Sequence, residues 1–155
     1  MRFGTLVLSG ALFLATALSA QAQSMIDGSQ VDEILNIARG YGAASLETQS
    51  NGDPKISGKM EGVTYHVFFM NCTDNKNCED LNFYAGFLDN KQTLEAINAW
   101  NRDKRFGKAY LDSDLDAVLE FDLNLEHGVS QKNLDSAFSL WSLMLDQYTT
   151  YIGYK

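Results

Sequence analysis

The chain has 155 residues and is acidic, with 12 Lys and Arg against 20 Asp and Glu and a formal net charge of −8. This charge argues against nucleic acid and anionic lipid headgroups as partners, because binding to either depends on cations that neutralise phosphates. Hydrophobic residues make up 45% of the chain, which excludes an intrinsically disordered protein and predicts a folded domain.

The first 22 residues have the pattern of a secretory signal peptide. Arg2 precedes a nearly continuous apolar run over residues 3–18, and "AQA" at 20–22 is a small-x-small cleavage pattern. The run is too short to favour a membrane anchor, and no later stretch has the length or apolarity of a membrane span. We therefore expect cleavage near Ala22 and a single domain over residues 23–155, located in the periplasm or secreted.

Helical periodicity begins close to the predicted cleavage point. The apolar stripe that predicts an N-terminal helix consists of Ile26, Val31, Ile34, Leu35 and Ala38. Gly40 or Gly42 ends this helix. A short, weak strand over residues 44–49 follows, and then a turn at "NGDP".

The dipeptide Glu61-Gly62 predicts a two-residue hairpin loop between two apolar strands. In that register Gly58 lies opposite Tyr65, whose ring can cover the glycine. The other predicted pairs are Met60 with Val63 and Ile56 with Val67. All six residues then share one face, and a shift of one residue would move every one of them to the other face.

Cys72 and Cys78 are the only cysteines, and they enclose "TDNKN". In an oxidising compartment so close a pair favours a structural disulfide. Redox chemistry and metal binding are the alternatives, but the spacing is not C-x-x-C, and His66 and His127 lie at no zinc-like spacing. No cofactor or metal is expected. With Cys72 opposite Cys78, the predicted cross-strand pairs are Phe69 with Leu81, Val67 with Phe83, Tyr65 with Ala85 and Val63 with Phe87, again on one face.

The segment "TLEAINAWNRDKRF" predicts a second helix, with Leu94, Ile97 and Trp100 or Asn101 at helical spacing. Two alternating strands follow. The buried set of the longer strand is predicted as Leu115, Ala117, Leu119, Phe121, Leu123 and Leu125. Its solvated set is predicted as Asp116, Glu120, Asp122 and Glu126. A loop over 112–114, with Asp114 left-handed, would place Leu111 opposite Leu115 and Ala109 opposite Ala117.

Ser130 is positioned to cap a long C-terminal helix. The apolar stripe of this helix is Leu134, Ala137, Phe138, Trp141, Leu145, Tyr148 and Ile152. Strands in adjacent hairpins together with segregated helices predict an α+β fold. The expected architecture is an antiparallel sheet of five to six strands with N-terminal, middle and C-terminal helices.

Residues 98–112, "NAWNRDKRFGKAYLD", concentrate positive charge in an otherwise acidic chain. The helix dipole accounts for most of it: the cations at positions 102, 104 and 105 are predicted to lie in the last turns of the second helix, where they complement the dipole. Lys108 is predicted to face Val118, diagonal to Asp116 and Glu120. The aromatic residues of the segment are expected to pack against the sheet.

The same segment resembles the central signature of the YbjN-domain family of bacterial sensory transduction regulators. The matching residues are Asn98, Trp100, Asn101, Arg105, Phe106, Lys108 and Ala109. The resemblance covers about residues 29–152 and implies a fold similar to type III secretion chaperones, which are often homodimers. It also implies a non-enzymatic, chaperone-like or regulatory role toward an unidentified protein partner, and it transfers no catalytic residue. The leader and the cysteine pair depart from cytoplasmic members.

An alternative function rests on Ser57 and His66, which are predicted to lie opposite each other on the second face of the sheet. A catalytic triad also needs a group that orients the histidine and an oxyanion pocket. The sequence has no G-x-S-x-G elbow and no evident carboxylate partner, which favours a polar cross-strand pair. A small ligand-binding protein or hydrolase using this face, with Tyr84 and Asn82, is the remaining alternative. The "DSDLD" carboxylates at 112–116 lack the glycine and glutamate of a calcium loop.

Overall fold

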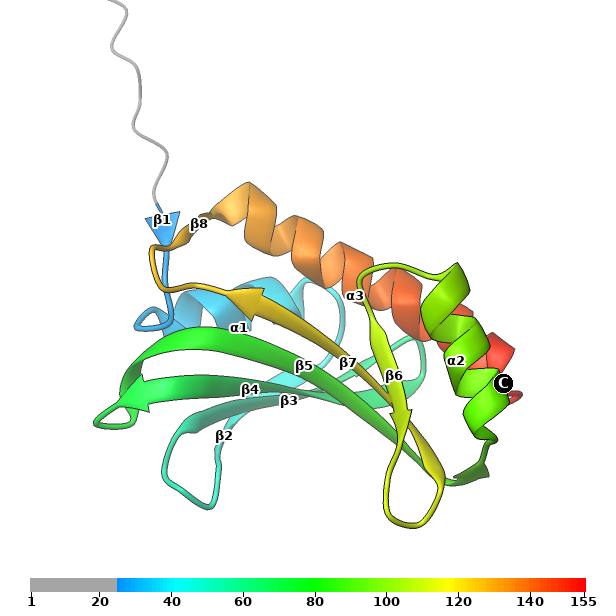
Figure 1. Ribbon diagram of the computed structural model, residues 1–155. Helices are drawn as coiled ribbons and strands as arrows, with labels where there is room; N and C mark the ends of the chain where they lie inside the picture. The colour runs from blue at the N-terminus through cyan, green and yellow to red at the C-terminus, as the bar shows by residue number, and fades with distance from the viewer. Residues whose placement is uncertain (1–24) are drawn as a thin grey trace, which may run out of the picture.

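The computed structural model describes residues 25–155, and the predicted leader lies outside them. Helices α1 and α3 lie over one face of a six-stranded antiparallel sheet, and α2 lies beside the C-terminal half of α3 (Figure 1). The helices are α1 (Val31–Arg39), α2 (Leu94–Asp103) and α3 (Gln131–Tyr151). The sheet strands are β2 (Ala44–Thr48), β3 (Pro54–Met60), β4 (Val63–Thr73), β5 (Lys76–Lys91), β6 (Lys108–Leu111) and β7 (Asp116–Asn124). The predicted α+β fold is confirmed.

The strands follow the order β2-β3-β4-β5-β7-β6, so that β2 and β6 form the two edges. A separate two-stranded ribbon joins β1 (Met25–Ile26) to β8 (Val129–Ser130) at the start of α3. Ile26 therefore lies in a strand, and its predicted place in the helical stripe is wrong. A turn separates Ile26 from helix α1. In this turn the Asp27 carboxylate accepts hydrogen bonds from the backbone N–H and the hydroxyl of Ser29.

The register predicted for the central strands is confirmed. The pairs across the β3–β4 hairpin are Met60 with Val63, Gly58 with Tyr65 and Ile56 with Val67. The pairs across the β4–β5 hairpin include Cys72 with Cys78, Phe69 with Leu81 and Val67 with Phe83. Tyr65 is 1% exposed, and a Cβ atom on Gly58 would lie 2.6 Å from its ring, so the ring covers the glycine as expected.

Helix α3 covers the sheet face on which these apolar residues lie. Every residue of its predicted apolar stripe is buried, including Ile152 just past the helix end. The Ser130 hydroxyl accepts a hydrogen bond from the Asn133 N–H at 3.2 Å, which is the predicted cap. Trp141 and Phe138 of α3 pack against Phe83 of the sheet at ring-centroid distances of 5.7 and 5.0 Å.

The loop between β6 and β7 differs from the prediction by one residue in length. The loop has four residues, 112–115, rather than three. The Asp112 carboxylate accepts hydrogen bonds from the backbone N–H groups of Asp114 and Asp116, both at 2.9 Å. The left-handed residue is Leu115, with φ 65°, and not Asp114. Leu115 is 57% exposed, so its predicted place in the buried set is wrong.

The longer loop shifts the β6–β7 pairing by two residues. Leu111 pairs with Ala117 and Ala109 pairs with Leu119, which corrects the predicted register. Asp116, predicted as solvated, is only 2% exposed. Its carboxylate forms an ion pair with Lys91 at 2.9 Å, because the two residues lie opposite each other where β5 pairs with β7.

Candidate functional site

The cation-rich segment lies where α2 ends, and only part of it is helical. Thr93 caps the helix by accepting a hydrogen bond from the Ala96 N–H, and the extended Lys104 ends it. Arg102 alone lies in the last turn, so the prediction that Lys104 and Arg105 also lie in the last turns of this helix is wrong. Leu94, the first helical residue, is 65% exposed, so its predicted place in the buried stripe is wrong.

Asn101 holds the C-terminal half of α2 against edge strand β6. Its side-chain amide donates to the carbonyl of Ala109 and accepts from the N–H of the same residue, both at 2.9 Å. The amide therefore satisfies the backbone groups that an edge strand would otherwise expose. Asn98, one turn earlier, is exposed and makes no side-chain hydrogen bond among the described residues.

Trp100 anchors α2 to the end of α3. It is 2% exposed, and its rings lie 4.8 Å from Tyr148 and 5.3 Å from Tyr151. Its indole N–H is buried and has no hydrogen-bond acceptor in the part of the chain that the structure describes. Tyr148 is fully buried, and burial raises the pKa of its phenol well above the ordinary value.

Lys108 belongs to a different surface from the other cations. It pairs across the strands with Glu120 rather than with Val118, as a consequence of the corrected register. Its ammonium group lies 2.6 Å from the Glu120 carboxylate, which raises the lysine pKa above its usual value. The same carboxylate accepts a hydrogen bond from the hydroxyl of Tyr110 at 2.8 Å. The charge of Lys108 is therefore already paired.

Phe106 follows α2 and is 60% exposed, so its predicted packing against the sheet is wrong. The guanidinium of Arg105 lies 5.2 Å from the centre of the Phe106 ring. The backbone of Phe106 is left-handed, with φ 75°, which directs the chain from the helix end into β6. This turn presents the aromatic ring next to α3.

A groove runs between the end of α2 and the C-terminal half of α3, and we refer to it as the α2–α3 groove. It consists of two adjoining hollows of about 410 and 220 Å³. The lining residues are Trp100, Asp103, Lys104, Arg105, Phe106, Leu140, Leu143, Met144, Asp146, Gln147, Thr150 and Tyr151. Lys104 crosses between the hollows, with its ammonium group donating to the Gln147 side-chain oxygen at 3.1 Å.

The α2–α3 groove carries large apolar side chains that the fold leaves uncovered. Phe106 is 60% exposed, Leu143 is 52% exposed and Tyr151 is 44% exposed. Clustered exposure of this kind marks interaction surfaces more often than isolated apolar residues do. The sequence singled out Phe106 but not Leu143. Leu143 could have been recognised as exposed, because it is a leucine of α3 that lies outside the predicted buried stripe.

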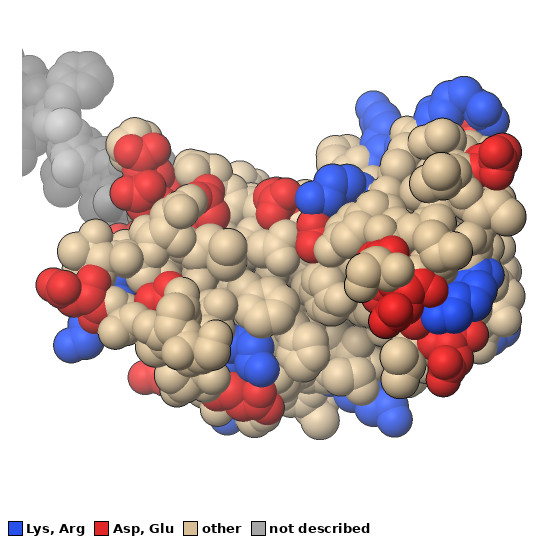
Figure 2. All heavy atoms as spheres, turned by 60° about the horizontal axis from the view of Figure 1, so that its bottom comes forward, with Lys and Arg blue, Asp and Glu red and all other residues tan. Residues whose placement is uncertain are grey.

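The sheet face opposite the helices carries the residues of the alternative function, Ser57, His66, Tyr84 and Asn82. The Ser57 hydroxyl and Nδ1 of His66 lie 2.9 Å apart, as the opposed positions predict. The His66 ring lies 5.7 Å from Phe68 and 6.4 Å from Tyr84, beside a hollow of about 260 Å³. Figure 2, turned to bring the underside of the sheet forward, shows uncharged side chains over most of the middle of this view. Asn82 is engaged with Asp122, to which its amide donates at 2.7 Å.

The acid nearest to Ser57 and His66 does not occupy the position that a catalytic triad requires. The nearby acid, Glu47, forms an ion pair with Lys55 at 2.9 Å, and its pKa is lowered by Lys55 and then by the Ser57 hydroxyl. The acid thus lies on the side of the serine, whereas a triad requires it on the histidine. Burial lowers the pKa of His66, which favours a neutral ring that bonds the serine.

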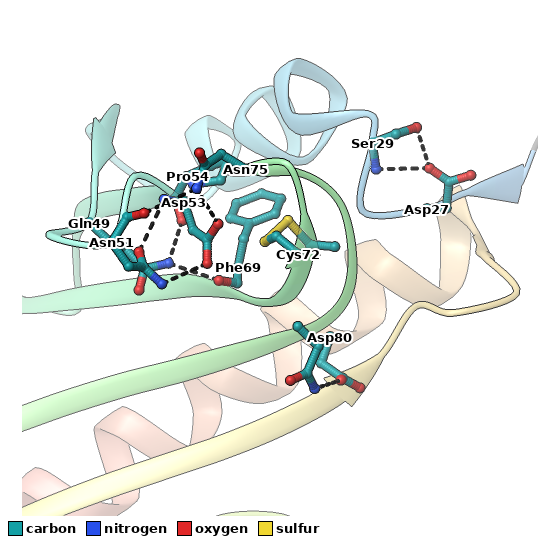
Figure 3. The surroundings of a disulfide bond; sticks show 12 residues. Asp27, Ser29, Gln49, Asn51, Asp53, Pro54, Phe69, Cys72, Asn75 and Asp80 are labelled. Carbon is teal, nitrogen blue, oxygen red and sulfur yellow. Dashed lines mark hydrogen bonds between the residues drawn. A yellow bond between two sulfur atoms is a disulfide. The ribbon is translucent and has the colours of Figure 1, made fainter.

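The predicted disulfide between Cys72 and Cys78 is present and closes the tip of the β4–β5 hairpin. Figure 3 shows that the loop between the two cysteines lies against the turn before β3. The Asn75 amide donates to the buried Asp53 carboxylate at 2.8 Å and to the carbonyl of Asn51 at 3.1 Å. The loop that the disulfide closes is therefore in contact with the turn between β2 and β3. Within residues 25–155 no group of three or more metal-ligating side chains occurs.

The fold defines the class of protein. A crystal structure of the Yersinia pestis type III secretion chaperone SycH, in complex with a stable fragment of YscM2, has the same fold, with a TM-score of 0.51 and 18% sequence identity. The match covers 77% of this chain and 97% of that one. The domain is thus an α+β domain with the fold of a type III secretion chaperone.

The family follows from the sequence match. The YbjN family model, described as "Putative bacterial sensory transduction regulator", matches residues 30–153. The chain belongs to the YbjN family, which confirms the resemblance seen in the segment after residue 98. A search of curated proteins gives no match.

Proposed function

We propose that this chain is an exported, non-enzymatic protein-binding domain with a chaperone-like regulatory role, and that it binds its partner in the α2–α3 groove. The exposure of Phe106 and Leu143 on facing sides of that groove carries the proposal. Membership of a regulator family and the fold of a chaperone that was solved with a bound protein fragment support it.

The composition of the groove suits protein recognition. Aromatic residues and arginine dominate binding energy at protein interfaces, and the groove contributes Trp100, Phe106, Tyr151 and Arg105. Covering one exposed Phe or Leu side chain stabilises a complex by roughly 1.5–3 kcal/mol. Trp100 belongs to the core and forms the base of the groove, whereas Phe106 and Leu143 are more than half exposed and remain available for binding.

Export is the second part of the proposal. The leader over residues 1–22 would be removed near Ala22, and residues 23–155 would act in the periplasm or outside the cell. The Cys72–Cys78 bond supports this location because disulfides persist in oxidising compartments. Among the residues that the structure describes, no helix is long and apolar enough to cross a membrane.

Site-specific photocrosslinking in the native host tests the groove. A benzophenone amino acid replaces Phe106 or, as a matched control, Leu46 on the far edge strand, which is 45% exposed. We expect a discrete crosslinked product from position 106 and none from position 46, and we expect Leu143→Ser to remove it. Equal products from both positions, or no product from position 106, would contradict the proposal.

A second candidate function is binding or hydrolysis of a small ligand on the second sheet face. The 2.9 Å contact between Ser57 and His66 beside a ring cluster is the observation in its favour. His66→Ala separates the two functions. If the groove is the working surface, this variant keeps the crosslink at position 106; if the second face is, the variant loses small-ligand binding or activity while it remains folded.

A further inference from the structure

We propose that the segment captured by the α2–α3 groove is an acidic peptide with apolar anchor residues. The inference rests on the proposed function and adds the chemistry of the partner. Its basis is the balance of charges along the groove, which is opposite in sign to the balance of the whole chain. Figure 1 shows the location, where α2 and the end of α3 lie next to each other.

The groove has two acidic residues, and each is already paired. The Asp103 carboxylate binds Arg102 at 2.8 Å, and this pairing lowers the aspartate pKa. The Asp146 carboxylate binds Lys155 at 3.0 Å. In each pair the two charges cancel at close range, so neither carboxylate presents a free negative charge to an occupant.

Two cations in the groove have no such partner. Within residues 25–155, neither Lys104 nor Arg105 forms an ion pair with a carboxylate. Lys104 binds the neutral Gln147 amide, and its ammonium group lies 5.7 Å from the Trp100 ring. Arg105 lies over Phe106. The groove thus offers two available positive charges in a chain whose formal net charge is −8.

The position of Lys104 relates the charge to the shape of the groove. Its side chain crosses the boundary between the two hollows and meets Gln147 of α3. An acidic side chain that binds here replaces the neutral acceptor of Lys104 with a negatively charged one, so that Coulomb attraction between opposite charges adds to the hydrogen bond. Apolar side chains of the same segment can then enter the hollows on either side, one beside Tyr151 and the other beside Phe106.

The acidic character of the whole chain does not cancel this preference. At physiological ionic strength charges are screened over about 8 Å, so distant carboxylates contribute little at the groove. Lys104 and Arg105 would be in direct contact with the occupant. Local attraction therefore exceeds long-range repulsion at the groove.

Selection from a library of random dodecapeptides displayed on phage tests the proposal. The target is the purified mature protein with its disulfide intact. We expect the enriched peptides to combine Asp or Glu with aromatic or aliphatic residues and to bind less tightly at high salt. Enrichment of basic or uncharged peptides, or no enrichment above an uncoated surface, would overturn the proposal.

Charge-reversal variants locate the binding. The double variant Lys104→Glu with Arg105→Glu should weaken binding of a selected synthetic peptide at least about tenfold, since two exposed charge contacts are reversed. Lys132→Glu, an exposed cation near the start of α3, is the matched control and should leave the affinity unchanged. Circular dichroism verifies that each variant is folded. Unchanged affinity in the double variant overturns the proposal.

The partner chemistry and the proposed function can fail separately. If Phe106→Ser and Leu143→Ser abolish peptide binding but charge reversal does not, the groove is the binding surface and the acidic chemistry is wrong. If neither pair of changes affects binding, the groove itself is wrong. Light scattering addresses a rival occupant: a dimer that Phe106→Ser converts to monomer would assign the groove to a second copy and overturn the proposal.

Discussion

The side chain of Asn101 forms both backbone hydrogen bonds of Ala109, as donor to its carbonyl and acceptor from its N–H at 2.9 Å. One amide thereby takes the role of a neighbouring strand at the edge formed by β6. It also fixes the end of α2, and so the position from which Lys104 and Phe106 project. A residue of the family signature is thus a structural support for the α2–α3 groove.

We expect Asn101→Ala to lower the free energy of unfolding by about 2 kcal/mol, because two partly buried hydrogen bonds are lost and the Ala109 backbone is left without its partner. Urea denaturation measures the change. Asn98→Ala is the matched control, since Asn98 is exposed and makes no side-chain hydrogen bond in the described chain; its effect should stay within about 0.5 kcal/mol. Equal losses in both variants would show that the amide clamp is not the cause.

Gly58→Ala should destabilise the protein by about 1–3 kcal/mol, because the new methyl group would lie 2.6 Å from the buried Tyr65 ring. Thermal or urea unfolding gives the value. In a double-mutant cycle with Tyr65→Leu, the smaller side chain makes room, so the cost of Gly58→Ala should fall. Additive losses in the double variant would mean that the clash is not with this ring.

Replacing both cysteines, Cys72→Ser with Cys78→Ser, should lower the free energy of unfolding by roughly 2 kcal/mol, since the bond closes a short loop. Hydrogen exchange should also speed up in the turn around Asp53, which receives Asn75 from that loop. Asn75→Gly is the control: it removes this contact, keeps the bond and suits the left-handed backbone at this position (φ 57°), so it should speed up exchange with a smaller loss of stability. Unchanged exchange in the double serine variant would show that the bond does not hold the two hairpins together.

The ion pair between Asp116 and Lys91 predicts an acid-dependent component of stability. Its hydrogen bond with Lys91 lowers the pKa of Asp116 below the ordinary value of 3.8. The unfolded chain therefore binds this proton more readily, and the stabilisation is present above pH 3.8 and is lost as pH falls through the lower folded pKa. Unfolding measured between pH 2 and 6 should show this slope in the native protein and a shallower one in Asp116→Asn. If stability changed with pH in the same way in both proteins, the Asp116–Lys91 ion pair would not be the source of the acid dependence.

Local patterns in the sequence were sufficient for most of the fold. The Glu61-Gly62 turn and the cysteine pair each set the register of a hairpin, because side chains alternate between faces and only one register buries the apolar set. The stripe of α3 was equally clear. The β6–β7 hairpin was misread because its loop depends on the Asp112 carboxylate, whose hydrogen bonds with Asp114 and Asp116 no spacing rule indicates.

For the candidate site, the sequence by itself determined which segment is unusual and which residues match the YbjN signature. Only the tertiary structure decided their roles, since it separates them by contact: Asn101 supports β6, Lys108 is paired with Glu120, and Phe106 is left exposed. The groove could not be predicted because half of it comes from α3, distant in the chain. Residues that line one surface share no sequence spacing when two packed helices bring them together, and only packing decides which side chains stay uncovered.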